Sequence, residues 1–264
     1  MNLGRLEGVN IAEAAVEVLV VVAIMALAVA IHALIQRRFT SDVLRRHNDV
    51  AGFIFAAVGV IYAVVLGFVV VVVWEKHNAT EALVQDHINA ISDLYRVVGG
   101  LPDPVRSQVR TELRRDVSEI IKVEWPQMSS RRGVPPIPPF LETMAHQITV
   151  FAPKTQDQAI VKQLAMAQTQ RLFDSRQQGV LQSSPSVPPV LWWALTVGAV
   201  TMLSFAFLLG TENRWTQLFM TALLAGLIAT LLIVIAEFDA PFSGSARISD
   251  DGWISLQHYL PRIP

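Results

Sequence analysis

Acidic side chains near the end of the last apolar run are the residues whose types could bind a metal. Glu237 and Asp239 flank the end of that run, and Asp250 and Asp251 follow in the tail. Carboxylates and turn carbonyls are the hard oxygen ligands that calcium takes. By spacing alone, however, these four fit solvated turn residues better, and we expect neither a metal nor another cofactor.

The other residue types that do chemistry form no catalytic pattern. The six histidines are dispersed, and His77 and His87, ten positions apart, do not share a helix face as metal ligands at i and i+4 would. The chain has no HExxH, GxSxG, Walker-type or GxGxxG motif. It also has no cysteine. We therefore predict that the protein is not an enzyme.

A row of apolar side chains occupies one face of the second apolar run. Val60, Val64 and Phe68 stand at i, i+4 and i+8, so they share a face of a helix. Gly59 and Gly67 lie on another stripe, which a neighbouring helix or subunit could approach closely. Around the axis of a symmetric ring the row would narrow a pore, because hydrophobic constrictions gate by dewetting. The alternative is that the row meets other helices or lipid.

Four apolar runs of membrane-spanning length position these residues, at 18–35, 52–74, 190–209 and 218–236. A hydrocarbon core about 30 Å thick takes roughly 20 apolar residues as a helix. Short polar links join the first run to the second and the third to the fourth. We therefore expect two transmembrane hairpins in the lipid bilayer. Glu7, Glu13 and Glu17 precede the first run and argue against a cleaved signal peptide.

The composition supports membrane insertion and argues against nucleic acid as a partner. The 264 residues are 52% hydrophobic and 16% charged, below the roughly 25% charged residues of globular domains. The net charge of -1 provides no basic excess for binding a polyanion.

We predict an all-α membrane protein with four transmembrane helices in two hairpins and a helical extramembrane domain between the second and third. Within that domain, Asp103 is expected to cap a helix that has Pro104 at its first position. His32 is interpreted as an interfacial ring rather than a buried proton relay. The expected parts are the first transmembrane helix and link (1–51), the second transmembrane helix with its extramembrane continuation (52–98), the helical domain (99–189), the third and fourth transmembrane helices (190–236), and a C-terminal tail (237–264).

Several motifs resemble those of a known family. They are HNDVAGFIFA at 47–56, LGF at 66–68, WEKHNATEA from Trp74, EW before Pro126, and EFDAPFSG at 237–244. With the order of hairpin, helical region, hairpin and tail, they resemble the bestrophins. The chain is more similar still to the bacterial membrane proteins labelled bestrophin-like, whose function is uncharacterised.

This resemblance implies a function. Bestrophins are ring-shaped homopentameric ion channels whose second transmembrane helix lines a hydrophobic neck and carries LGF. By that match Phe68 would be a neck residue, with Val64 and Val60 before it on the same face. The resemblance implies a homo-oligomer, with a pentamer as the family state, in a bacterial inner membrane with a cytoplasmic helical domain. Four arginines of the first link favour the opposite orientation by the positive-inside rule: Arg37, Arg38, Arg45 and Arg46.

The tail matches the family in part. Bestrophins have a PFG motif followed by an acidic calcium-binding cluster. Here Pro241 and Phe242 fit, Ser243 intervenes before Gly244, and the dense acidic run is missing. The resemblance therefore does not extend to a calcium site. The alternative to a channel is a non-conducting membrane scaffold or stress-related adaptor that acts through its helical domain.

Overall fold

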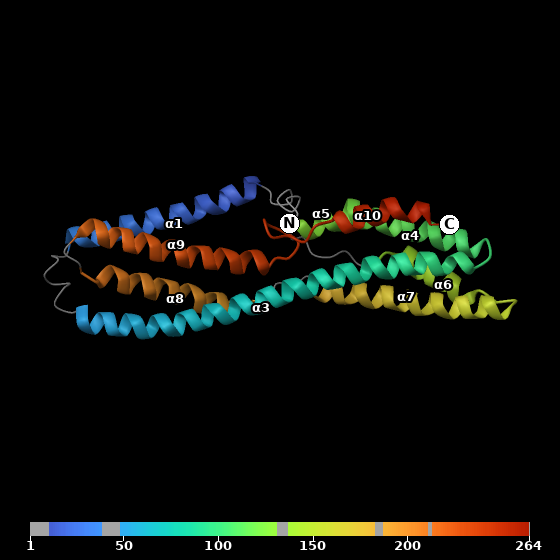
Figure 1. The fold of residues 1–264 in the computed structure, drawn as a ribbon, viewed down its shortest axis with the longest axis horizontal. Coiled ribbons are helices and arrows are strands. Elements are labelled where there is room, and N and C mark those ends of the chain that lie inside the picture. The colour runs from blue at the N-terminus through green and yellow to red at the C-terminus, as the bar shows by residue number, and fades with distance from the viewer. Residues whose placement is uncertain (1–10, 39–47, 131–136, 183–186, 211–212, 264) are drawn as a thin grey trace, which may run out of the picture. The chain divides into compact units, whose positions relative to one another are not determined.

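Four long apolar helices contain the four runs that the sequence predicts to span a membrane. The computed structural model describes residues 11–38, 48–130, 137–182, 187–210 and 213–263 (Figure 1). In these residues, four helices have the length and composition needed to cross a membrane. They are α1 (Ile11–Arg38), α3 (Asn48–Val97), α8 (Pro189–Leu208) and α9 (Arg214–Phe238).

Helix α3 continues without a break beyond its apolar run. It has 50 residues, which at about 1.5 Å each gives roughly 75 Å. A 3₁₀ turn at Val98–Gly100 follows its last residue, Val97. One helix therefore covers nearly all of the expected range 52–98.

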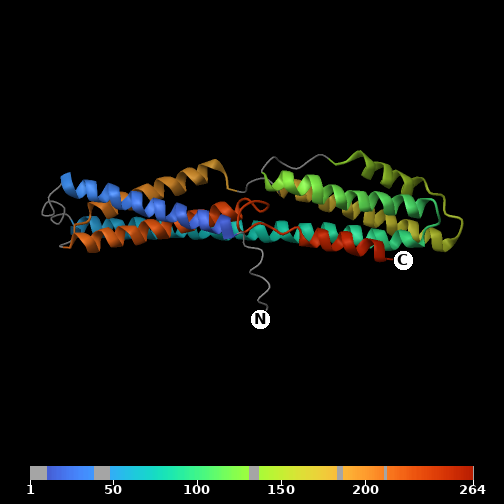
Figure 2. The same cartoon turned by 90° about the horizontal axis from the view of Figure 1, so that it is seen from above.

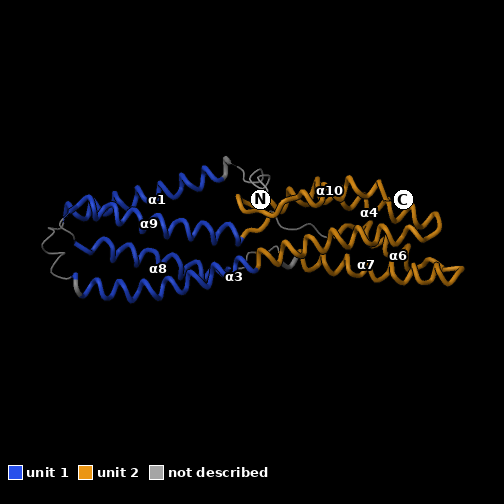
Figure 3. The backbone as a smooth tube through the Cα atoms, in the orientation of Figure 1, with its two compact units in different colours: residues 1–75, 185–239 blue, residues 76–184, 240–264 orange. Residues whose placement is uncertain are grey.

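The chain divides into two compact units (Figure 3). Unit 1 comprises residues 1–75 and 185–239, and unit 2 comprises residues 76–184 and 240–264. Helix α3 contributes its first part to unit 1 and its second part to unit 2.

In unit 1, α1 packs mainly along α9, which both ribbon views show (Figures 1 and 2). Helix α8 contacts α9 and also packs on α3. The buried face of α3 carries one residue every three or four positions, which is the spacing of a single helical stripe. This stripe consists of Tyr62, Leu66, Val69 and Val73, and it packs in one cluster with Leu195, Ala199 and Met202 of α8.

In unit 2, shorter helices share one apolar core with the second part of α3. They are α4 (Val105–Glu119), a π-helical turn (Ile120–Glu124), α5 (Trp125–Ser129), α6 (Pro139–Val150), α7 (Gln156–Gln182) and α10 (Asp251–Tyr259), which continues as a 3₁₀ turn at Leu260–Arg262. The tail contributes Trp253, Leu256 and Leu260 to this core. Residues 240–264 of the tail therefore belong to unit 2.

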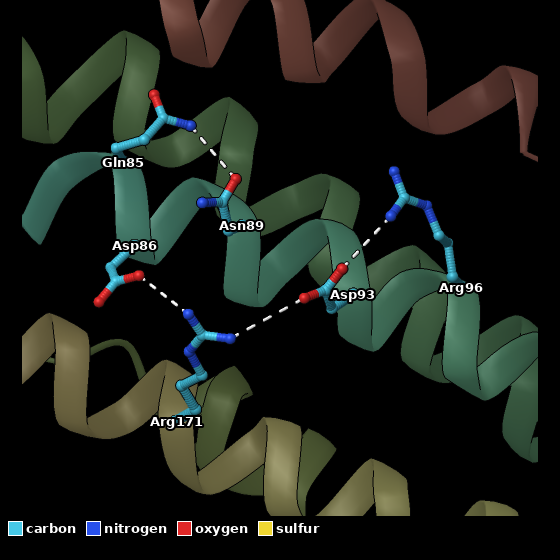
Figure 4. A network of polar contacts seen from close by, with 6 residues as sticks. All are labelled: Gln85, Asp86, Asn89, Asp93, Arg96 and Arg171. Carbon is cyan, nitrogen blue, oxygen red and sulfur yellow. Dashed lines mark hydrogen bonds and ion pairs between the residues drawn. The ribbon is translucent and has the colours of Figure 1, made fainter. Parts of the chain in front are cut away.

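Ion pairs join α3 to α7 on the surface of unit 2 (Figure 4). Arg171 of α7 lies 2.9 Å from a carboxylate oxygen of Asp86 and 4.0 Å from one of Asp93. Arg96 lies 3.3 Å from Asp93 and donates to the Tyr259 hydroxyl at 3.2 Å. These side chains are 38–53% exposed, so each pair contributes about 0–1 kcal/mol.

The start of α4 differs from the prediction. Pro104 precedes the helix, which begins at Val105, and no side chain caps it. Asp103 pairs instead with Arg106, three residues further on. The N-cap prediction was wrong because Pro104, not Asp103, occupies the N-cap position, so the helix begins one residue later than expected.

Candidate functional site

The predicted neck residues lie on a face of α3 that the described residues of unit 1 leave more than half exposed. Val60 is 65% exposed, Val64 52% and Phe68 69%. The face of α3 that packs on α8 carries Tyr62 and Leu66 instead. Three large apolar side chains in a row thus remain available to lipid, to another subunit, or to the axis of an assembly.

An apolar hollow lies beside this row, within unit 1. It has a volume of about 240 Å³, and its walls come from α3 and from the chain at the start of α8. Its lining consists of Val65, Phe68, Val69, Val72, Val187 and Leu191. Part of the Phe68 side chain therefore lines this hollow, and 69% of the residue remains exposed.

Of the two acidic residues at the end of α9, Asp239 makes hydrogen bonds that hold the chain together at this point. Asp239 is buried and follows the helix, and its carboxylate accepts a hydrogen bond from the backbone N–H of Val187 at 2.9 Å. Its own N–H donates to the Ile235 carbonyl at 2.9 Å. Glu237 lies in the last turn of the same helix. Asp239 thus ties the chain before α8 to the end of α9, which is a structural role.

The rest of the tail motif belongs to the core of unit 2. Phe242 is buried, and its ring meets Trp125 edge-on with centroids 5.4 Å apart. The Pro241 carbonyl accepts from the Ile248 N–H at 2.8 Å, which closes the loop between them. Gly244 lies within that loop with φ of 86°. The motif therefore shapes a tight loop that packs an aromatic anchor.

Across the described parts of the chain, no three histidine, cysteine or acidic residues are close enough to hold a metal ion. The tail carboxylates named above do not converge there. This finding concerns only these described residues.

A charge cluster buried in unit 2 was not predicted. Arg176 of α7 is 4% exposed and pairs with two carboxylates, Asp116 of α4 at 3.3 Å and Glu124 of the π-helical turn. Asp116 is 0% and Glu124 5% exposed. His87 of α3 is also buried, and its ring meets Trp253 edge-on at 5.1 Å.

Burial dominates the protonation of this cluster. It raises the pKa of Asp116 to about 7, against the opposing charge of Arg176. It also raises the pKa of Glu124, again opposed by Arg176. Burial together with the Arg176 charge lowers the pKa of His87 to about 3, so this ring is neutral at pH 7.

A second polar cluster joins α1, α8 and α9 inside unit 1. His32 is 0% exposed, and its Nδ1 lies 2.7 Å from the Thr221 hydroxyl. Gln36 lies 3.3 Å from His32 Nε2 and donates to the Gln217 side chain at 2.9 Å. The His32 ring also contacts Phe207 of α8. The interpretation of His32 as an interfacial ring was wrong, because α9 supplies a polar partner that buries it.

The sequence contains weak signals for the buried charge cluster of unit 2. His87 occupies a position of the apolar repeat of α3, and Asp116 is adjacent to Val117 of the apolar face of α4. A polar residue at a core position indicates a buried partner. The partner itself, Arg176, is 60 positions from Asp116, and periodicity cannot reveal that contact.

Comparisons with known proteins agree with this architecture. A crystal structure of a bacterial bestrophin homologue from Klebsiella pneumoniae, a point variant, has a TM-score of 0.70 at 16% identity, covering 92% of this chain and 98% of that one. Another variant of that homologue has a TM-score of 0.67 at 15% identity, with coverages of 92% and 98%. A third structure, described as a membrane protein, has a TM-score of 0.66 at 16% identity over 90% and 96%. No curated protein sequence matches the chain significantly.

The overall fold is thus shared with solved structures. A family model described as Bestrophin-like domain matches residues 22–252, which is most of the chain. The protein therefore belongs to the Bestrophin-like family.

Proposed function

We propose that this chain assembles around an axis into an ion-conducting pore in the bacterial inner membrane, with the pentamer as the expected state. Membership of the Bestrophin-like family supports this, together with the likeness in fold to structures described as bacterial bestrophin homologues. The two predicted hairpins would lie in the bilayer, and the helical domain on the cytoplasmic side. No enzymatic step is part of this proposal.

The observation that carries the proposal is the uncovered row on α3. Val60, Val64 and Phe68 are more than half exposed although each is strongly apolar. A ring of such side chains, one set from each copy, would form a hydrophobic neck. Ions would cross it only when the constriction is wide enough to stay hydrated.

Purified protein in liposomes tests the proposal. We expect ion flux through the wild type, and we expect Phe68→Ala to change conductance or gating because it widens the neck. Phe219→Ala is the matched control, since Phe219 lies on α9 and is also exposed, at 64%. It removes the same ring from another helix and should leave flux unchanged.

The assembly must be measured in the same samples. Intact oligomers that pass no ions would reject the pore and favour a non-conducting scaffold. Equal effects of Phe68→Ala and Phe219→Ala would reject the placement of the neck on this face of α3.

A further inference from the structure

A small cavity lies beside the buried charge cluster of unit 2. Its volume is about 50 Å³, which is large enough to hold water. The titratable groups that line it are His87 of α3, Glu124 of the π-helical turn and Arg176 of α7. The tail contributes two aromatic walls, Phe242 and Trp253, and no charged group.

The charges of the cluster do not balance when both carboxylates are ionised. Among the described residues, Arg176 is the guanidinium that pairs with both Asp116 and Glu124, and all three side chains are at least nine-tenths buried. Glu119 of α4 adds further negative charge near both carboxylates. A buried net charge without a partner is unfavourable, and the usual response is neutralisation by a proton.

The described residues around the cluster provide no other neutralising group. His87 cannot supply positive charge, since burial and Arg176 keep it neutral, with a pKa of about 3. Glu112, one turn before Asp116 on α4, lies 3.8 Å from Arg115. The tail brings only its two aromatic rings to the cavity. A proton is therefore the species that best completes the charge balance.

Polar atoms of residues that line the cavity, and of Asp116 beside Arg176, also lack a hydrogen-bond partner among the described residues. The buried atoms without a hydrogen bond include His87 Nε2, Asp116 Oδ2, Arg176 Nε and Trp253 Nε1. Buried polar groups are nearly always satisfied by protein or by water. Water in the cavity can satisfy the atoms that line it and carry a proton to the cluster.

The local backbone places Glu124 at this point. It is the last residue of the π-helical turn Ile120–Glu124, between α4 and α5. Such turns are rare in proteins, and those that occur are often found at functional sites. The turn places the Glu124 carboxylate next to Arg176 of α7.

We propose that Asp116, Glu124 and Arg176 form a proton-binding site, in which one proton neutralises one of the two carboxylates and its release loosens the docking of α10. Loss of the proton leaves a buried net negative charge. Water then enters the cavity to solvate that charge and displaces the aromatic wall that Phe242 and Trp253 provide. The proposal concerns unit 2 alone and does not rest on ion conduction.

Hydrogen exchange of the full-length protein at pH 6 and pH 8 tests this coupling. The exchange rate of the α10 amides is divided by the exchange rate of the α6 amides. Both helices belong to unit 2, and the ratio of the two rates removes the intrinsic effect of pH on amide exchange. The pKa of Asp116 is about 7 when α10 is docked, and we expect an ordinary, lower value when α10 is undocked. The docked state therefore loses a proton between pH 6 and pH 8, and proton linkage predicts that the exchange ratio rises about tenfold over this range. Asp116→Asn and Glu124→Gln should each abolish that rise.

Asp86→Asn is the matched control, because Asp86 is a carboxylate of unit 2 that is 53% exposed. It should keep the wild-type dependence on pH. A flat ratio in the wild type, or the same rise in Asp116→Asn as in the wild type, would overturn the proposal.

Infrared difference spectroscopy gives a second readout that does not depend on the folding of any variant. We expect the carbonyl band of a protonated carboxylic acid in the wild-type protein at pH 6 and its loss at pH 8. The absence of that band at pH 6 would reject the bound proton, whatever the exchange data show.

Discussion

The Nδ1 atom of His32 lies 2.7 Å from the hydroxyl oxygen of Thr221, and this contact joins α1 to α9 inside unit 1. The Thr221 hydroxyl donates its own hydrogen to the Gln217 carbonyl at 3.0 Å. Thr221 must therefore accept from His32, which assigns the proton to Nδ1. The other ring nitrogen is then free to accept from the Gln36 amide at 3.3 Å. One neutral ring thus links the Gln36 amide of its own helix to the Thr221 hydroxyl of α9.

Removing this link should weaken the packing of α1 on α9. His32→Phe and Thr221→Val, alone and together, form a double-mutant cycle, and we expect a coupling energy of about 0.6 kcal/mol, with about 1.7 kcal/mol as an upper value. Unfolding of the full-length protein in detergent measures it. Thr196→Val serves as the control partner, because Thr196 is exposed on α8 and bonds only to its own helix. Equal coupling in both cycles would contradict the specific role of Thr221.

Gly198 allows α3 and α8 to approach closely, and alanine there should be destabilising. A Cβ atom at this position would overlap the ring of Tyr62, whose hydroxyl donates to the Leu195 carbonyl at 3.1 Å. The ring would have to move and lose that bond, so we expect Gly198→Ala to cost about 1–3 kcal/mol.

Gly52→Ala supplies the comparison. A Cβ at Gly52 meets nothing within 4 Å, and alanine is favoured over glycine in a helix by about 1 kcal/mol. Thermal unfolding should therefore shift in opposite directions for the two variants. A Gly198→Ala protein as stable as the wild type would show that Tyr62 has another position available.

The sequence predicts the spanning helices well and their partners poorly. Apolar length suffices to predict α1 and α9, since hydrocarbon thickness sets the number of residues. The pairing of α1 with α9 depends on local fits instead, such as Met25 against Gly226 and His32 against Thr221. Neither fit has a periodic signature. For the same physical reason, the buried cluster around Arg176 could not be predicted.

For the predicted neck, the sequence predicts which residues share a face but not what that face contacts. Helical spacing alone places Val60, Val64 and Phe68 on one face, and the structure leaves that face uncovered in the single chain. What covers it depends on other copies or on lipid, and intrachain packing carries no information about either. The neck therefore remains a prediction that flux measurements decide.

Arg176 and Arg171 lie on the same helix but in different environments, and their substitutions should differ. Arg176→Met leaves Asp116 and Glu124 buried without their cation, which costs about 3–5 kcal/mol. Arg171→Met removes exposed pairs with Asp86 and Asp93 and should cost about 1 kcal/mol or less. Unfolding of both variants under one condition provides the comparison. Similar losses would mean that the buried cluster is solvated.

His87 should make unit 2 sensitive to acid. Its pKa is about 3 in the folded protein and about 6.5 when unfolded, so its contribution is present above pH 6.5 and is lost as the pH falls toward 3. Asp116 acts in the opposite sense, since its raised pKa favours the folded state at low pH. The difference in stability between His87→Gln and the wild type isolates the histidine. It should change by about 1.4 kcal/mol per pH unit between pH 6 and 4, in favour of the variant on acidification. A difference independent of pH would show that His87 is already protonated in the fold.

Gly244 should tolerate substitution in an order that its backbone sets. Its φ of 86° lies in the left-handed region, where a Cβ atom costs about 1–2 kcal/mol and asparagine is tolerated better than other residues. The loop around it is closed by the Ile248 N–H bond to Pro241, so the chain cannot easily adopt another path. We expect Gly244→Asn to be the mildest change, Gly244→Ala intermediate and Gly244→Val the most destabilising in thermal unfolding. Gly179→Ala, in helix α7 with no atom within 4 Å of its Cβ, should be neutral or stabilising. If asparagine and valine at position 244 are equally tolerated, the loop does not hold the left-handed conformation in solution.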